Sequence, residues 1–207
     1  MAVLYKPHSE ALISISKPAL VFSLLAFFLH RTKHLDTAKK YWVVAALFFS
    51  LGGDILLMQK SEGFFLAGVG LFGLAQIAYS GFYVSLKTPL RWRVIVPAAL
   101  LPLAADISSG AKYIRLGVVY YGLCRFTGCT FLWSVNLASQ VSGEVRYALL
   151  GIILFMASGF MLALAKFNDG DKYFQIGVML TYGLAQYLIT YGLLRYLETR
   201  INSKSAS

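Results

Sequence analysis

Charged residues and cysteine are scarce in this sequence. Only 14% of its 207 residues are Asp, Glu, Lys or Arg, against about 25% in ordinary soluble domains, which argues against a soluble globular domain. The two cysteines, Cys124 and Cys129, lie in one apolar run and do not suit the framework of a disulfide-rich secreted domain. The three histidines, His8, His30 and His34, lie at or outside the ends of apolar runs, so we expect no metal site.

Several catalytic and cofactor motifs are also absent. The sequence has no Gly-x-Ser-x-Gly elbow of a serine hydrolase and no glycine-rich loop that would cradle a phosphate. No lysine lies between residues 173 and 203, which excludes a retinal Schiff base in the last apolar run. We therefore expect no cofactor. The formal net charge is +10, but the positive residues lie between apolar runs, so we expect membrane lipid rather than nucleic acid as a partner.

Long apolar runs make up most of the chain, and 58% of its residues are apolar. A spanning helix needs about 20 such residues, and continuous runs favour helices over the alternating strands of a barrel. The sequence predicts an all-α fold, a polytopic transmembrane helix bundle with about seven spans. We expect a single membrane domain over 1–207 with a disordered tail at 202–207. The predicted spans are about 12–30, 41–59, 63–85, 93–109, 114–138, 147–166 and 173–196.

The number and the orientation of the spans depend on prolines and basic residues. Lys17-Pro18 interrupts the first run, while Pro97 and Pro102 should kink the fourth, so six or eight spans stay open. Basic residues are more numerous on one side of the predicted bundle, which places the C-terminus in the cytoplasm and the N-terminus outside. The basic residues of that side are Arg31, Lys33, Lys39, Lys40, Lys87, Arg91, Arg93, Arg146, Arg195, Arg200 and Lys204.

Two parts of the sequence resemble each other. Residues 47–60 align with 152–166, and residues 64–76 align with 174–186, each of the latter pair ending in Gly-Leu-Ala-Gln. The copies would share one orientation, which predicts a parallel internal repeat of the kind found in transporters with a three-plus-one-plus-three plan. The alternative is a chance likeness between glycine-rich apolar helices.

Asp54 is the one acidic residue well inside an apolar run. Placing a charged Asp at the bilayer centre costs about 2.5–3.5 kcal/mol on insertion scales, so we expect it to face a cavity or a partner. Burial favours the neutral carboxylic acid, which can serve as a general acid. The alternative is a residue that pairs helices beside the close-packing Gly52 and Gly53.

Other polar residues inside the spans are candidates for the same site. Arg125 in the fifth span would pair with Asp54 or hold a phosphate, or its side chain would extend to the membrane surface. Gln76 lies about 20 Å from the loop that follows the second span and Asp54 about 9 Å, at 1.5 Å per residue. The two are level only if a helix is tilted or broken. The candidates for a polar pocket, or for hydrogen bonds between helices, are Gln76, Tyr79, Tyr182 and Gln186.

Several motifs together resemble the YhhN family, which includes the lysoplasmalogenases. They are FFSLGGDILLM around Asp54, the Phe-Gly-Phe-Gln-Tyr string through Gln76 and Tyr79, GIILFMASGFMLALAKF at 151–167, TYGLAQ at 181–186 and Lys17-Pro18. The resemblance covers about 17–195. It implies a multi-pass membrane hydrolase that cleaves the vinyl ether bond of a lysoplasmalogen to a fatty aldehyde and a glycerophospho-ethanolamine or -choline. It also implies eight spans, of which this chain would lack the first.

If the chain is such a hydrolase, the chemistry of the vinyl ether suggests a hypothesis for the roles of individual residues. Neutral Asp54 would protonate the vinyl ether, Lys17 or Arg125 would hold the phosphate of a lysophospholipid substrate, and Gln76, Tyr182 or Gln186 would orient water. The chain departs from the family pattern at Gln76, where His is usual, and at Gly159, where Asp is frequent. The alternative function is a small-molecule or lipid transporter or binding protein, and the oligomeric state stays open. The positions that match the family are Asp54, Tyr79, Ser158, Tyr182 and Gln186.

Overall fold

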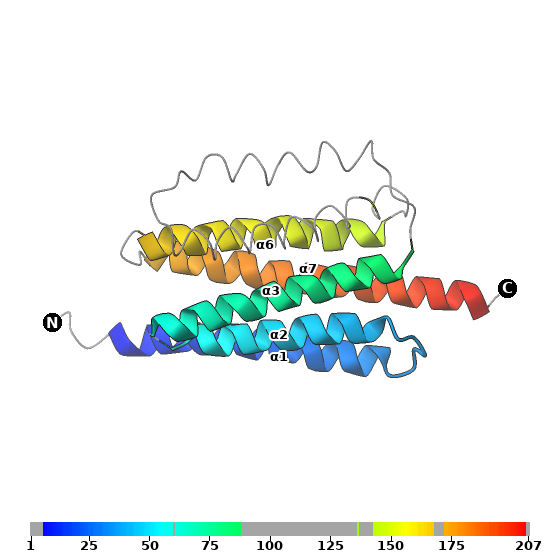
Figure 1. Cartoon of the computed structure of the whole chain (residues 1–207), viewed down its shortest axis with the longest axis horizontal. Helices are drawn as coiled ribbons and strands as arrows, with labels where there is room; N and C mark the ends of the chain where they lie inside the picture. The colour runs from blue at the N-terminus through cyan, green and yellow to red at the C-terminus, as the bar shows by residue number, and fades with distance from the viewer. Residues whose placement is uncertain (1–5, 60, 88–135, 137–142, 168–171, 206–207) are drawn as a thin grey trace.

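The computed structural model describes five helices that lie side by side in a long bundle (Figure 1). Every regular element in the described part of the chain is an α-helix. The described residues are 6–59, 61–87, 136, 143–167 and 172–205. The helices are α1 (Lys6–Thr32), α2 (Lys40–Leu57), α3 (Glu62–Ser85), α6 (Glu144–Phe167) and α7 (Lys172–Ser205).

The five helices correspond to five of the predicted spans. By length and composition, α2, α3 and residues Ile176–Arg200 of α7 can each cross a membrane, whereas the apolar stretch of α6, Val145–Gly159, is shorter. Helix α1 continues through Pro18 without a break. The predicted spans at 93–109 and, apart from Asn136, 114–138 lie outside the described residues, so the count of seven spans stays a prediction.

At the C-terminal end, α7 continues to Ser205. The disordered tail expected at 202–207 stays a prediction. No Gly or Pro follows Gly192 to end the helix. Two contacts are made near this end, one from α1 and one within α7. Arg31 at the end of α1 donates a hydrogen bond of 2.8 Å to Glu198, and Arg200 lies over the ring of Tyr196 at 5.7 Å.

The bundle is built from two hairpins joined by α1. Helices α2 and α3 form one hairpin and α6 and α7 the other, and the closest packing is within each hairpin. Helix α1 packs against both α2 and α7. Between the hairpins, the backbones approach closely only at α2 and α7, while side chains of α3 such as Phe72 reach α6 and α7. Both hairpins run in the same sense along the bundle, as Figure 1 shows. This is the arrangement that a parallel repeat requires, although it does not establish one.

Glycines allow the close approach of helices within each hairpin. A Cβ atom on Gly53 would lie 2.9 Å from the Phe72 ring and 3.1 Å from the carbonyl oxygen of Gly68, so α2 and α3 are in near backbone contact there. In the other hairpin, a Cβ on Gly151 would lie 2.7 Å from the carbonyl oxygen of Ala185. Small residues at such crossings are what holds helices together in lipid.

Replacing Gly151 by alanine is expected to destabilise the protein by about 1–3 kcal/mol, the usual cost of overpacking. The added methyl group would meet backbone atoms of α7, which cannot move without shifting the helix. The measurement is the thermal unfolding midpoint in detergent. Gly159→Ala is the matched control, because nothing lies within 4 Å of that Cβ. Equal unfolding midpoints for the two variants would contradict the close crossing.

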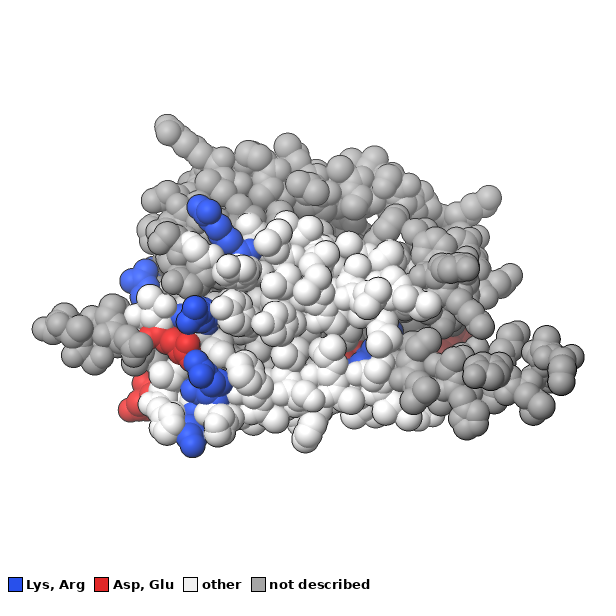
Figure 2. Space-filling model, turned by 180° about the vertical axis from the view of Figure 1, so that it is seen from behind, with Lys and Arg blue, Asp and Glu red and all other residues white. Residues whose placement is uncertain are grey.

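The outer surface has an apolar middle and a charged end. On the face that Figure 2 draws, the coloured Lys, Arg, Asp and Glu side chains gather mainly at the end where α1 ends and α2 begins, which is the end that was expected to face the cytoplasm. Large apolar side chains are exposed along the middle, with Phe22 at 62%, Phe48 at 63% and Leu180 at 65%. Apolar surface of this extent is unfavourable in water and suits contact with lipid.

Candidate functional site

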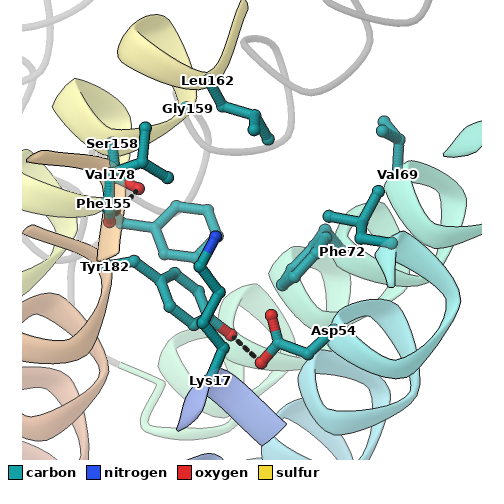
Figure 3. A pocket seen from close by; sticks show the side chains of 11 residues that line it. Lys17, Asp54, Val69, Phe72, Phe155, Ser158, Gly159, Leu162, Val178 and Tyr182 are labelled. Atoms are coloured by element: carbon teal, nitrogen blue, oxygen red, sulfur yellow. Dashed lines mark hydrogen bonds between the residues drawn. The ribbon is translucent and has the colours of Figure 1, made fainter. Parts of the chain in front are cut away.

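Asp54 points into the bundle rather than toward the surface. It lies near the end of α2, beside the close crossing with α3, and its side chain is only 4% exposed. The residue lines a cavity of about 50 Å³, and Figure 3 shows one of its carboxylate oxygens directed into this space. Besides Asp54, the cavity is lined by Lys17, Leu57, Val69, Phe72, Phe155, Ser158, Gly159, Leu162, Val178 and Tyr182.

The second oxygen of Asp54 is bound by a tyrosine. The hydroxyl of Tyr182 on α7 donates a hydrogen bond of 2.9 Å to Asp54 Oδ2. The Tyr182 ring packs edge-on against Phe72, with centroids 5.9 Å apart, and at a tilt against Phe155, with centroids 6.0 Å apart. Packing against these two apolar rings holds the Tyr182 ring in place and so fixes the direction of its hydroxyl group. The contact therefore joins an acid on one hairpin to a donor on the other.

A chain of hydrogen bonds continues behind Tyr182. Gln186, one turn further along α7, donates from Nε2 to Ser50 Oγ at 3.2 Å and to the Tyr182 hydroxyl oxygen at 3.4 Å. Tyr79 on α3 donates from its hydroxyl to Gln186 Oε1 at 3.1 Å. All of these side chains are buried. Three of the four bonds, those from Tyr182 to Asp54, from Gln186 to Ser50 and from Tyr79 to Gln186, therefore connect the two hairpins.

Lys17 is the basic residue of the cavity within the described part of the chain. It comes from α1, which packs against both hairpins, and Figure 3 shows its nitrogen extended into the cavity. No ion pair within 4.0 Å joins Lys17 to Asp54. Ser158 also lines the cavity, but its hydroxyl donates to the Val178 carbonyl at 3.4 Å. The cavity thus places an acid and a separate cation around one small space.

Comparison with known proteins identifies the group to which this chain is related. Residues 12–193, most of the chain, match the profile of the YhhN family. The chain belongs to the YhhN family. The resemblance inferred from its motifs is therefore confirmed. Together with the long apolar helices, membership in this family makes the chain an integral membrane protein.

Two relatives of this YhhN protein carry a functional name. It is 27% identical over 154 residues to lysoplasmalogenase TMEM86A of Homo sapiens and 27% identical over 156 residues to lysoplasmalogenase TMEM86A of Bos taurus. Each match covers 71% of this chain and 62% of the relative, so the chain spans less than two thirds of the length of these relatives. No solved structure matches the chain.

The structure of this YhhN protein brings together part of the predicted site. Lys17, Asp54, Ser158 and Tyr182 line the cavity, whereas Tyr79 and Gln186 lie behind Tyr182 in the hydrogen-bond chain. The lining contains no Gln76, and Arg125 lies outside the described residues.

The different depths of Gln76 and Asp54 explain why Gln76 does not line the cavity. Gln76 is 1% exposed on α3, one turn beyond Phe72, which is the α3 residue beside Asp54. Gln76 therefore belongs to the buried interior and not to the lining of the cavity.

Ser50 is part of the hydrogen-bond chain but was not among the predicted residues. It lies four residues before Asp54 on α2, and residues at this spacing share one face of a helix. That spacing is the signal that would have found it. In the described part of the chain, no group of three or more His, Cys, Asp and Glu residues could hold a metal ion.

Proposed function

We propose that this YhhN protein is a multi-pass membrane hydrolase that cleaves the vinyl ether bond of a lysoplasmalogen. The products would be a fatty aldehyde and a glycerophospho-ethanolamine or -choline. The observation that carries the proposal is Asp54, a buried acid with one oxygen held by Tyr182 and the other facing a cavity. The names of the two TMEM86A relatives support the same activity.

Hydrolysis of a vinyl ether requires a proton donor, an anionic group that stabilises a cation, and one water molecule. Protonation of the carbon β to the ether oxygen converts the vinyl ether to an oxocarbenium ion, and water then adds to the carbon next to the oxygen. Asp54 would donate the proton from its cavity-facing oxygen and then, as a carboxylate, stabilise the cation. The adding water returns one proton to Asp54, and the resulting hemiacetal collapses to aldehyde and alcohol. General acid catalysis of this kind contributes about 10²–10⁴-fold.

The size of the cavity limits what it would hold. A buried water needs about 10–15 Å³ of such space, so a cavity of about 50 Å³ has room for water beside Asp54, and a whole lipid would extend beyond it. The alkenyl chain would therefore lie against the apolar outer surface of the bundle. Lys17 would bind the phosphate from the same cavity, since an ammonium group binds phosphate as a point charge.

Replacing Lys17 by methionine is expected to raise KM by about 10-fold or more. This factor corresponds to the free energy lost with one hydrogen bond to a charged group. The value of kcat should change little, because Lys17 would bind the phosphate equally in the ground and transition states. The measurement is steady-state kinetics with a lysoplasmalogen in detergent micelles. Lys33→Met, at an exposed position after α1, is the control. A fall in kcat at constant KM would contradict this role.

Aldehyde release from lysoplasmalogen by the purified protein is the experiment that tests the proposed hydrolase. The matched comparison is Asp54→Asn, which retains the shape of the side chain but has no acidic proton. The expected release by the wild-type protein is dependent on protein concentration and accompanied by equal amounts of the glycerophospho product. Absence of aldehyde from well-folded wild-type protein would contradict the proposal.

The alternative function is a transporter or binding protein for lipids or small molecules. One observation favours it: the cavity is lined by residues of two hairpins that run in the same sense along the bundle. Asp54 and Gln186 would then border a substrate path. Flux of a lysolipid across liposomes that contain the protein, without aldehyde production, would support this function over hydrolysis.

A further inference from the structure

The hydrogen bonds around Tyr182 have a defined direction. The amide nitrogen of Gln186 can only donate, so the Tyr182 oxygen accepts at their 3.4 Å contact. The hydroxyl group of Tyr182 has a single proton of its own. That proton is donated to Asp54 Oδ2, 2.9 Å away. Tyr182 therefore receives a hydrogen bond from one side and gives one to the other.

The orientation of the Gln186 amide is fixed in turn. Tyr79 donates its hydroxyl proton to Gln186 Oε1, and this leaves Nε2 directed toward Ser50 and Tyr182. A flipped amide would direct its oxygen toward Tyr182 and lose the bond from Nε2. Tyr79 and Gln186 are both 0% exposed, so water does not compete for these groups. Buried hydrogen bonds in such a chain also strengthen one another.

We infer that Tyr79 and Gln186 are positioning residues, which act through Tyr182 to place the transferable proton of Asp54 on its cavity-facing oxygen. This inference rests on the proposed general-acid function of Asp54. Neither Tyr79 nor Gln186 lines the cavity, so neither would touch the substrate. Their effect reaches the reacting atoms only along the hydrogen-bond chain.

The position of the acidic proton on Asp54 follows from the difference between the two oxygens of a neutral carboxylic acid. One oxygen carries the proton and the other is a carbonyl oxygen, which is the better acceptor. Oδ2 accepts the bond from Tyr182 and so takes the carbonyl role. The acidic proton then resides on Oδ1, the oxygen that Figure 3 shows directed into the cavity. Without the hydrogen bonds from Tyr79 and Gln186, the Tyr182 hydroxyl would no longer be oriented, and the acidic proton would occupy either oxygen of Asp54. A proton on Oδ2 would face Tyr182 and could not be transferred to the substrate.

A structural role alone would have different consequences. If Tyr79 and Gln186 only held the hairpins together, their loss would lower stability but leave the carboxylic acid of Asp54 unchanged in the molecules that remain folded. The test therefore needs a signal from Asp54 itself. The carbonyl stretch of a protonated carboxyl group is such a signal, because its frequency falls when the oxygen accepts a hydrogen bond.

The experiment is infrared difference spectroscopy of the full chain in detergent at neutral pH. Subtracting the spectrum of Asp54→Asn from that of the wild-type protein assigns the carboxylic acid band. We expect this band to move to higher frequency in Gln186→Met and Tyr79→Phe. A band that stays in place in both variants would overturn the positioning role alone. A wild-type protein without the band would overturn the neutral acid, and with it both proposals.

Kinetics provide the second readout. We expect Gln186→Met to lower kcat by about 10-fold, no more than the loss of the Tyr182 hydroxyl itself and within the range for one neutral hydrogen bond, with KM unchanged. Tyr79→Phe should have a smaller effect of the same kind and carries the test if Gln186→Met does not fold. A rise in KM at constant kcat in Tyr79→Phe would overturn the inference.

Thr190→Val is the matched control for both measurements. Thr190 is buried on α7 one turn beyond Gln186, and its hydroxyl has no hydrogen-bond partner within the described residues. The substitution removes a buried hydroxyl group from the same helix but leaves the hydrogen bonds of Tyr79, Gln186 and Tyr182 in place. We expect both the band and kcat to stay as in the wild-type protein. Equal changes in Thr190→Val and Gln186→Met would overturn the positioning role.

Discussion

Asp54→Asn is expected to lower the rate of aldehyde release by at least about 10²–10⁴-fold, the range for loss of a general acid. Asparagine matches the shape of the acid and can still accept the hydrogen bond from Tyr182, so packing around the cavity should be preserved. The amide group, however, has no proton acidic enough to transfer to a vinyl carbon. The measurement is a coupled assay in which the released aldehyde is reduced by a nicotinamide-dependent dehydrogenase.

The control for this substitution is Asp36→Asn, which removes an exposed carboxyl group from the connection between α1 and α2. Its rate should equal that of the wild-type protein. Thermal unfolding in detergent checks that Asp54→Asn is folded. Equal aldehyde release by Asp54→Asn and the wild-type protein would exclude Asp54 as the acid.

Tyr182→Phe is expected to lower kcat by about 10-fold to 10²-fold, the factor that corresponds to 1.5–3 kcal/mol for a hydrogen bond to a charged group. Proton transfer converts Asp54 to a carboxylate, and the hydroxyl of Tyr182 would stabilise this charge in a buried site. Phenylalanine retains the ring that packs against Phe72 and Phe155. The effect should therefore appear in kcat, measured at saturating lysoplasmalogen.

Tyr187→Phe is the matched control for Tyr182→Phe. Its ring lies on the same helix but is 49% exposed, away from the cavity. This variant should retain the wild-type kcat. If Tyr182→Phe is as active as Tyr187→Phe, the hydroxyl of Tyr182 does not contribute to proton transfer.

The helices and the central acid could be predicted from the sequence because the physics behind them is simple. Apolar runs of sufficient length give helices, and the beginnings of α2 and α3 fall within one residue of the predicted spans at 41–59 and 63–85. The free energy cost of an acid in lipid made Asp54 a candidate, and the structure does bury it.

The partners of Asp54 were harder to predict. In a water-soluble helix, polar residues mark the outer face, but a helix in lipid is apolar on both sides and its pattern does not indicate its rotation. Ser50 was missed for this reason. Gln76 was a candidate for the polar pocket although its depth along α3 argued against a place beside Asp54, and it does not line the cavity. The direction of each hydrogen bond depends on tertiary contacts between α2, α3 and α7, which the sequence does not specify locally.

The cavity lies toward the end of the bundle opposite the charged end. Asp54 is near the last turn of α2, and Val178 and Tyr182 belong to the first half of α7. If the charged end faces the cytoplasm, the proposed reaction would consume lysolipids of the outer leaflet. Such lipids cross a bilayer slowly because the head group must pass through hydrocarbon. The protein would then deplete one leaflet, and the supply of substrate would depend on lipid flipping or on release from outside.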